Sequence, residues 1–136
     1  QQIALTVADI KPILMEGDDD KLLRVLQNLV NHSVETFGGK EGQVFLNAVK
    51  QDDSVLVMYG DSGPAIPPES RRAIFDPFSE SGDRKTGGLS LAIAKAMIDA
   101  HHGEIRVNAE KTEGRQFDII LPVHQKKRDA ARQSGS

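Results

Sequence analysis

One apolar segment that ends in a carboxylate turn strongly constrains how this chain can fold. Residues 55–59 are apolar or aromatic and predict a buried strand, which ends sharply at Gly60 and Asp61. A carboxylate at the exit of such a strand can accept a hydrogen bond from a flat ligand, and Gly63 lets the backbone approach that ligand closely. The same segment is also typical of a plain Asp-Ser-Gly turn before a helix, so its interpretation depends on the rest of the chain.

The composition is that of a globular domain. Of the 136 residues, 38% are hydrophobic and 27% are charged, and a chain of this length can bury an ordinary core. No apolar run approaches the roughly 18 residues that a membrane-spanning helix needs. The chain has no cysteine, which excludes disulfides and thiolate zinc sites and fits a cytoplasmic protein.

The charge is distributed unevenly along the chain. The net charge is -3, but residues 124–136 carry four basic residues and one acidic residue, so this tail is +3 and the body is -6. An acidic body argues against nucleic acid as the main partner. We expect residues 1–123 to form the domain and residues 124–136 to be a basic disordered tail or linker.

The first part of the chain predicts two strands and a long helix. Residues 3–7 alternate apolar with small or polar side chains, and residues 12–15 form a second short apolar run. The acidic residues 18–20 can cap a helix that runs from about residue 19 to residue 37, where two glycines would end it.

Spacings of three and four predict which face of this helix is buried. Asn28, His32 and Glu35 are expected on roughly the opposite, solvated face. The predicted buried residues are Leu22, Leu26, Leu29, Val30, Ser33 and Phe37.

The remaining patterns complete an α+β fold. The predicted elements are strands over residues 43–50 and 55–60, a short helix over 67–74, a polar loop over 79–88, a helix over 89–102, and strands over 104–108 and 116–121. The second long helix is expected to bury Leu89, Ile93, Ala96, Met97 and Ala100. His101 and His102 are expected at its end, where cationic side chains are favoured, rather than as ligands. The order β-β-α-β-β-α-α-β-β indicates a two-layer α/β sandwich with a mixed, mostly antiparallel sheet and helices on one face.

Four motifs, in this order, resemble the catalytic ATP-binding domain of sensor histidine kinases. Residues 18–33 follow the helix pattern D-x-x-x-L-x-x-V-L-x-N-L-L-x-N-A, and residues 61–66 match the glycine box D-x-G-x-G-I in all but one place. Residues 74–78, Ile-Phe-Asp-Pro-Phe, are similar to the F box, and residues 86–105 resemble the second glycine box and the helix and strand after it. The resemblance covers about residues 3–123 and implies the Bergerat-type fold shared with the gyrase, Hsp90 and MutL ATPases.

The resemblance also implies a ligand, partners and site residues. The ligand would be ATP or ADP, and the partner a histidine-containing dimerisation domain or a response regulator. The domain itself would contact neither nucleic acid nor a membrane, although it would fit the cytosolic part of a membrane-bound sensor. The family's acceptor histidine lies in a separate dimerisation domain, so no catalytic residue is assigned in this chain. The residues that match nucleotide-binding positions are Asn28, His32, Asp61, Gly63, Ile66, Phe75, Gly87, Gly88 and Leu89.

Departures from the family pattern gather at the phosphate end of this site. His32 stands where the family has the asparagine that completes the magnesium shell, and Glu35 stands where a lysine often faces the phosphates. Mg²⁺ prefers octahedral oxygen ligands, and a carboxylate repels phosphate. Ala65 replaces a glycine of the first box, and Gly88 is the one glycine in register with those of the second, G-T-G-L-G-L. A slip of one residue would instead pair Thr86 and Gly87 with the family's Thr-Gly. Such glycines let backbone amides cradle phosphate at the start of a helix.

The adenine end of the pattern is kept by Asp61, Gly63 and Ile66. We therefore expect a degenerate, pseudokinase-like domain with weak or lost binding of ATP or ADP, doubtful Mg²⁺ binding, no protein metal site, and a regulatory or partner-binding role in a phosphorelay. The alternative is a competent domain that phosphorylates a histidine on a separate dimerisation domain. An anti-sigma-factor type of serine kinase fits less well because a catalytic base is missing. A gyrase-type ATPase would need a glutamate where Arg24 and Gln27 stand.

Overall fold

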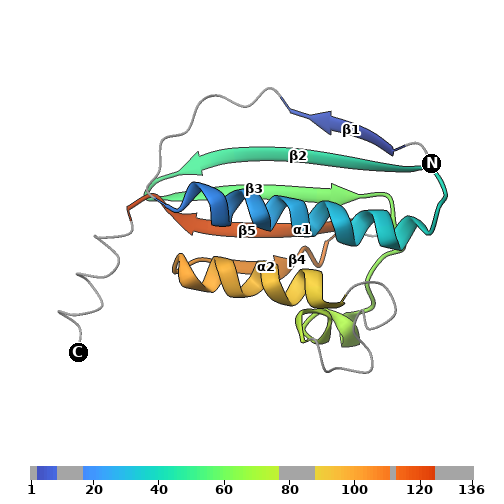
Figure 1. Ribbon diagram of the computed structural model, residues 1–136. Helices are drawn as coiled ribbons and strands as arrows, with labels where there is room; N and C mark the ends of the chain where they lie inside the picture. The colour runs from blue at the N-terminus through green and yellow to red at the C-terminus, as the bar shows by residue number, and fades with distance from the viewer. Residues whose placement is uncertain (1–2, 9–16, 77–87, 111–112, 125–136) are drawn as a thin grey trace.

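Five strands within the described residues form one mixed sheet, with the spatial order β1-β2-β3-β5-β4 (Figure 1). The computed structural model describes residues 3–8, 17–76, 88–110 and 113–124. β1 pairs with β2 in parallel, and the other three neighbouring pairs are antiparallel. The strands are β1 (Ile3–Val7), β2 (Gly42–Gln51), β3 (Ser54–Asp61), β4 (Glu104–Val107) and β5 (Arg115–Pro122).

Some predicted features lie outside the described residues. They are the strand over residues 12–15, the loop over residues 79–88 apart from Gly88, and the tail after His124. Gly87, one of the predicted nucleotide-binding residues, is among them. These features stay predictions.

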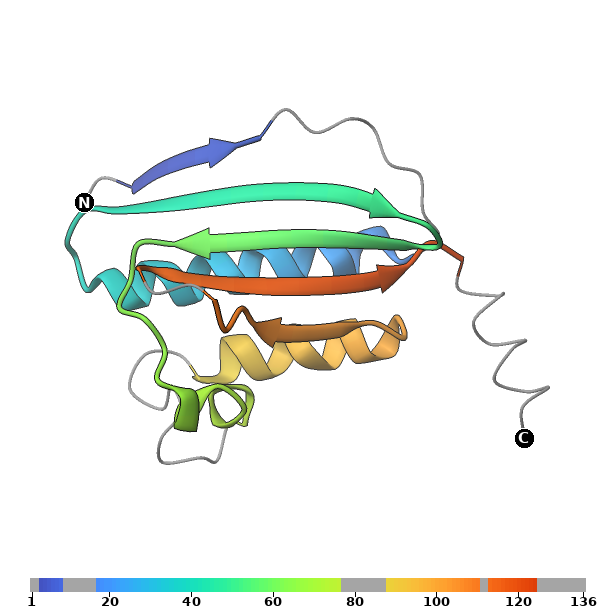
Figure 2. The ribbon, with the colours of Figure 1, turned by 180° about the vertical axis from the view of Figure 1, so that it is seen from behind.

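Both long helices, α1 (Asp19–Phe37) and α2 (Gly88–Ala100), pack on the same face of the sheet. Figure 2 views the sheet from behind, where the described part of the chain places no α-helix. Two 3-10 turns, η1 (Pro68–Ser70) and η2 (Ala73–Phe75), replace the short helix predicted over residues 67–74. The predicted fold class, a two-layer α+β sandwich with a mixed, mostly antiparallel sheet and helices on one face, is confirmed.

The buried face of α1 differs in part from the predicted face. Val25, Leu29 and Ser33 are buried, whereas Val30, predicted to be buried, is 39% exposed. The prediction for His32 was wrong, because this side chain is only 1% exposed. Apolar residues continue around part of this helix, so spacing alone did not fix the edge of the buried arc. His32 lies at that edge and finds a polar partner inside the fold.

The buried face of α2 was also predicted wrongly. Leu91, Ala94 and Ile98 are buried, while Leu89 is 65% exposed and Ile93 is 42% exposed. Apolar residues surround most of this helix, so spacings of three and four fit more than one face. Packing against α1 and η2 selects the face that carries Leu91 and Ile98.

The β2–β3 hairpin carries Asp61 to the end of the central strand. A tight turn at Asp52, whose φ of +54° lies in the left-handed region, reverses the chain. The antiparallel registers then pair Asp61 with Val44 on β2 and with Arg115 on β5. This pairing brings together two charged residues that are 54 positions apart in the sequence.

His101 joins the end of α2 to the start of α1. Its Nε2 atom accepts a hydrogen bond of 2.9 Å from the backbone N–H of Asp18, the N-cap residue of α1. Because Nε2 accepts, the proton of the neutral ring is on Nδ1, which donates to the Met97 carbonyl at 2.9 Å. His101 therefore lies at a helix end, as predicted. Its contacts are those of a neutral ring, however, and not those of the cation expected there.

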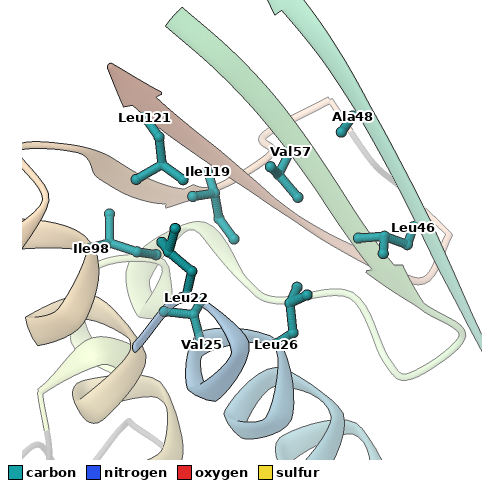
Figure 3. Close-up of a pocket in the computed structure, with 9 residues that line it drawn as sticks. All are labelled: Leu22, Val25, Leu26, Leu46, Ala48, Val57, Ile98, Ile119 and Leu121. Carbon is teal, nitrogen blue, oxygen red and sulfur yellow. The ribbon is translucent and has the colours of Figure 1, made fainter. Parts of the chain in front are cut away.

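An apolar pocket of about 220 Å³ lies between the helices and the sheet (Figure 3). All of its lining side chains are hydrocarbon, so none can orient a polar ligand through a hydrogen bond. This pocket is therefore not the candidate nucleotide site. Its lining residues are Leu22, Val25, Leu26, Leu46, Ala48, Val57, Ile98, Ile119 and Leu121.

We predict that His101→Leu lowers the free energy of unfolding by about 1–3 kcal/mol, because it leaves the Asp18 N–H without its acceptor. Urea denaturation followed by circular dichroism measures this change. The control is Lys95→Ala, which breaks an exposed ion pair of 2.8 Å with Asp99 within α2 and should cost less than about 0.5 kcal/mol. Equal effects of the two substitutions would contradict a structural role for His101.

Candidate functional site

Asp61 is the centre of a buried polar cluster at the end of β3. Asp61 is 2% exposed, and Arg115, at the start of β5, is 6% exposed. The carboxylate and the guanidinium form a buried ion pair, with 2.5 Å between Arg115 Nη2 and Asp61 Oδ2. A second contact, from Arg115 Nε to Asp61 Oδ1 at 2.9 Å, makes the pair bidentate.

Two further donors complete the surroundings of the carboxylate. The backbone N–H of Gly63 donates to Oδ1 at 2.9 Å, and the Ser33 hydroxyl donates to Oδ2 at 2.6 Å. An ionised carboxylate offers about four acceptor positions, two on each oxygen. Each oxygen of Asp61 thus accepts two hydrogen bonds from the chain's own groups. The residue that was expected to accept from a flat ligand is already fully engaged.

Tyr59 extends the cluster away from Asp61. Its hydroxyl oxygen lies 2.8 Å from Ser33 Oγ. Because Ser33 gives its single hydroxyl proton to Asp61, the Tyr59 hydroxyl donates to Ser33. Burial foremost raises the pKa of Tyr59 to about 12, so the phenol keeps its proton at neutral pH.

Arg115 also binds two residues of α1. Its Nη1 lies 2.9 Å from His32 Nε2, and its Nη2 donates to Thr36 Oγ1 at 3.2 Å. A guanidinium can only donate, so His32 Nε2 accepts and the imidazole is neutral in this arrangement. The Phe117 ring packs edge-on to His32, with 6.2 Å between the ring centroids.

These contacts explain why His32 does not share the solvated face predicted for it. Glu35 is exposed and Asn28 is partly exposed, as expected for that face. His32 turns inward because Arg115 supplies the hydrogen bond that a buried imidazole needs.

The electrostatics of Asp61 follow from the same contacts. Burial by itself would raise the pKa of this carboxyl, because it disfavours the charged form. The hydrogen bonds and charge of Arg115, with further hydrogen bonds from Ser33 and Gly63, outweigh burial and hold the pKa below its usual value. Asp61 is therefore ionised throughout the physiological range.

Gly63 has a packing role in the cluster. A Cβ atom added there would lie 2.9 Å from Thr36 Cγ2, 3.0 Å from Asp61 Oδ1 and 3.1 Å from Arg115 Nε. All three distances are shorter than ordinary van der Waals contacts, so a side chain would push the cluster apart. The absence of a side chain at Gly63 therefore lets the turn close over the ion pair.

The other predicted site residues lie outside this hydrogen-bonded cluster. Phe75 is buried and contacts it indirectly, edge-on to Phe117 at 6.2 Å, and Ile66 packs partly buried against the core. Asn28 donates its amide to the Arg24 carbonyl at 2.8 Å, within its own helix. Gly88 begins α2, and the next residue, Leu89, is largely exposed. The cluster thus contains three of the predicted residues, His32, Asp61 and Gly63.

Four residues of the cluster were not among the predicted site residues: Arg115, Ser33, Tyr59 and Thr36. Ser33 was assigned only to the buried face of α1, and Tyr59 only to the central strand. Arg115 had one usable signal, since a buried carboxylate requires a cation and Arg115 is the basic residue of the last predicted strand region. The partnership itself depends on the register of β3 and β5.

The side chains present do not fit the magnesium ion that the family resemblance implies. Among the described residues, no group of three or more His, Asp or Glu side chains is placed to hold a metal ion. His32, at the position expected to complete the magnesium shell, presents Nε2 to a guanidinium instead. A cation beside that guanidinium would be repelled.

Comparison with known proteins places the chain in a family. Residues 17–125 match the family described as "Histidine kinase-, DNA gyrase B-, and HSP90-like ATPase", and the chain belongs to it. The predicted resemblance to histidine kinase ATP-binding domains is thereby confirmed.

Sequence relatives and solved structures narrow the similarity to sensor kinases. The chain is 37% identical over 122 residues to the alginate biosynthesis sensor protein KinB of Pseudomonas aeruginosa, a match that covers 89% of this chain and 20% of KinB. It is 33% identical over 116 residues to the sensor histidine kinase ZraS of Salmonella typhimurium, covering 85% of this chain and 24% of ZraS. The chain therefore spans about a fifth to a quarter of the length of these relatives.

Two solved structures have the same fold. The mycobacterial sensor histidine kinase MprB superposes with a TM-score of 0.74 at 28% identity, covering 90% of this chain and 83% of that one. The catalytic domain of histidine kinase ThkA superposes with a TM-score of 0.73 at 28% identity, covering 93% of this chain and 80% of that one.

Among the helices that the structure describes here, none is long and apolar enough to cross a bilayer.

We predict that Asp61→Asn lowers the free energy of unfolding at pH 7 by about 3–5 kcal/mol, because it leaves Arg115 buried without its counter-charge. The pKa of Asp61 is lowered in the folded state, so its stabilising effect is present above the unfolded-state pKa of about 3.9 and is lost as the pH falls through the lower folded-state pKa. The difference between the two proteins should therefore narrow below about pH 4. Urea denaturation between pH 7 and pH 2 measures it, and a difference that stays constant over this range would contradict the assignment.

Proposed function

We propose that this chain is a degenerate ATP-binding domain of a two-component sensor histidine kinase, with weak or lost binding of Mg-ATP and a regulatory role in a phosphorelay. The observation that carries this proposal is the hydrogen bond between His32 Nε2 and Arg115. It turns the residue at the expected magnesium position inward, to 1% exposure, and commits its lone pair to a guanidinium.

The neighbouring residue at the phosphate end supports the same proposal. Glu35 is exposed on α1, one turn beyond His32, where its carboxylate can act on an approaching phosphate chain through solvent. Two like charges repel, and this repulsion is weakened but not removed at a protein surface. A triphosphate would therefore meet a carboxylate where the family pattern has a lysine.

We further propose that the domain acts through a histidine-containing dimerisation domain or a response regulator. One supporting observation is the structure described as histidine kinase ThkA in complex with response regulator protein TrrA, which superposes on this chain with a TM-score of 0.72 at 26% identity. That match covers 92% of this chain and 35% of the ThkA chain. A cytoplasmic location belongs to the same proposal, since phosphorelay partners and ATP are found there.

The second candidate is a catalytically competent histidine kinase domain. The 37% identity to KinB and the retained pair Asp61 and Gly63 favour it. The two candidates differ in whether Mg²⁺ strengthens nucleotide binding.

Calorimetric titration of the purified chain with ATP and with ADP, each with and without Mg²⁺, separates them. We expect weak binding whose affinity changes less than about twofold when Mg²⁺ is added, since His32, at the position expected to complete the metal shell, offers no oxygen ligand and binds Arg115 instead. An increase of tenfold or more on adding Mg²⁺ would establish the competent domain instead.

We predict that the double substitution His32→Asn and Glu35→Lys restores a dependence on Mg²⁺. Asparagine supplies an oxygen ligand, and lysine replaces a repelled contact with an attracted one. The ratio of ATP affinities with and without Mg²⁺ should rise by about tenfold or more, which corresponds to roughly 1.4 kcal/mol. The charge-matched control is Glu41→Lys, a substitution at an exposed position that should leave the ratio unchanged. A double variant that folds but shows no rise would refute the roles given to His32 and Glu35.

A further inference from the structure

Arg115 occupies the hydrogen-bonding positions through which Asp61 would recognise a base. Its Nε and Nη2 atoms donate to the two carboxylate oxygens at 2.9 and 2.5 Å. Ser33 and the Gly63 N–H take the remaining acceptor positions. An incoming amino group would have to displace one of these four donors.

We infer that Arg115 is an internal occupant of the adenine end of the site, so that the chain closes its own base pocket with a guanidinium. The inference deepens the proposed function and rests on it, because it concerns the other end of the same site. The sequence alone suggested that this end was intact, since Asp61, Gly63 and Ile66 are all present.

The geometry of a guanidinium suits this role. It is flat and presents a rigid fork of N–H donors that matches a carboxylate. An adenine is also flat and offers its exocyclic amino group as a donor to a carboxylate. Both groups therefore compete for Asp61, and Arg115 is covalently attached, so it is always at the site.

The surroundings make Arg115 hard to displace. Besides Asp61, it binds His32 and Thr36 of α1, and its guanidinium carbon lies 5.8 Å from the centroid of the Phe117 ring. A base that took over Asp61 would leave a buried cation without its counter-charge, unless the side chain swung out to water. Displacement therefore costs most of the binding energy that a single base could provide.

The same residue connects the two ends of the site. Arg115 holds Asp61 at the base end and His32 at the phosphate end through different nitrogen atoms. One substitution at this position should therefore open the base end, while Mg²⁺ dependence still requires changes on α1. This separation lets the two proposals be tested apart.

The experiment is a calorimetric titration of the chain and its Arg115→Ser variant with adenosine and with inosine, without phosphate or Mg²⁺. Adenosine carries an amino group that can donate to Asp61, whereas inosine carries a carbonyl oxygen at that position, which a carboxylate cannot accept from. We expect the variant to bind adenosine at least about tenfold more tightly than the parent chain, with no such gain for inosine. The control is Arg106→Ser, which removes an exposed arginine from β4 and should change neither affinity.

Two results would overturn the inference. One is a folded Arg115→Ser protein that binds adenosine no more tightly than the parent chain. The other is equal gains for adenosine and inosine. None of these readouts involves Mg²⁺. The proposal of weak magnesium binding can therefore be refuted while the closed base pocket is supported, and the closed base pocket can be refuted while weak magnesium binding is supported.

A second measurement covers the case in which Arg115→Ser does not fold. In the parent chain, the Nε–H of Arg115 should give an NMR signal protected from exchange with water, because it donates to a buried carboxylate. Saturating adenosine should leave the chemical shift of this signal and its protection from exchange unchanged. A shift or loss of protection on adding adenosine would show that the base displaces the guanidinium, which contradicts the inference.

Discussion

The ion pair between Asp61 and Arg115 is the interaction on which the rest of this structure depends. It joins the ends of two neighbouring strands and, through Ser33, His32 and Thr36, fixes α1 against them. Charges can stay buried only where nearly every donor and acceptor is satisfied. Here the carboxylate accepts four hydrogen bonds and all three guanidinium nitrogens donate. The pair therefore acts less as an isolated salt bridge than as the centre of a network that fixes how helix and sheet meet.

The position of this network has a consequence for function. Relatives of this chain are sensor kinases, and the matched motifs put the network where a nucleotide would be expected to bind. The Asp61 carboxylate, which would otherwise be available to a ligand, accepts its hydrogen bonds from groups of the same chain. A site built in this way is stable without a ligand, and it gains little from one. In the function we propose, weak nucleotide binding and a well-packed interior both follow from this one arginine.

Neutral histidines contribute to the same packing at two separate places. His32 accepts from Arg115 inside the network, and His101 accepts from the Asp18 N–H where α1 begins. In both residues the acceptor nitrogen is fixed by a donor that cannot reverse its role. These two histidines therefore stabilise the fold as uncharged rings that accept a hydrogen bond. A surface histidine near the end of a helix would instead stabilise it through a positive charge.

The sequence by itself determined the order of the two long helices and the five described strands, the α+β class and the family, because these depend on local periodicity, capping residues and motifs with fixed spacing. It also located Asp61 and Gly63 at the exit of the central strand. Tertiary structure alone decided which face of α2 is buried, since apolar residues surround that helix, and where His32 points. Above all, it decided the partner of Asp61. Arg115 lies 54 residues further along, and only the register of β3 against β5 brings it opposite the carboxylate. Local patterns carry no information about that register, so the sequence suggested an open base site where the fold had already filled it.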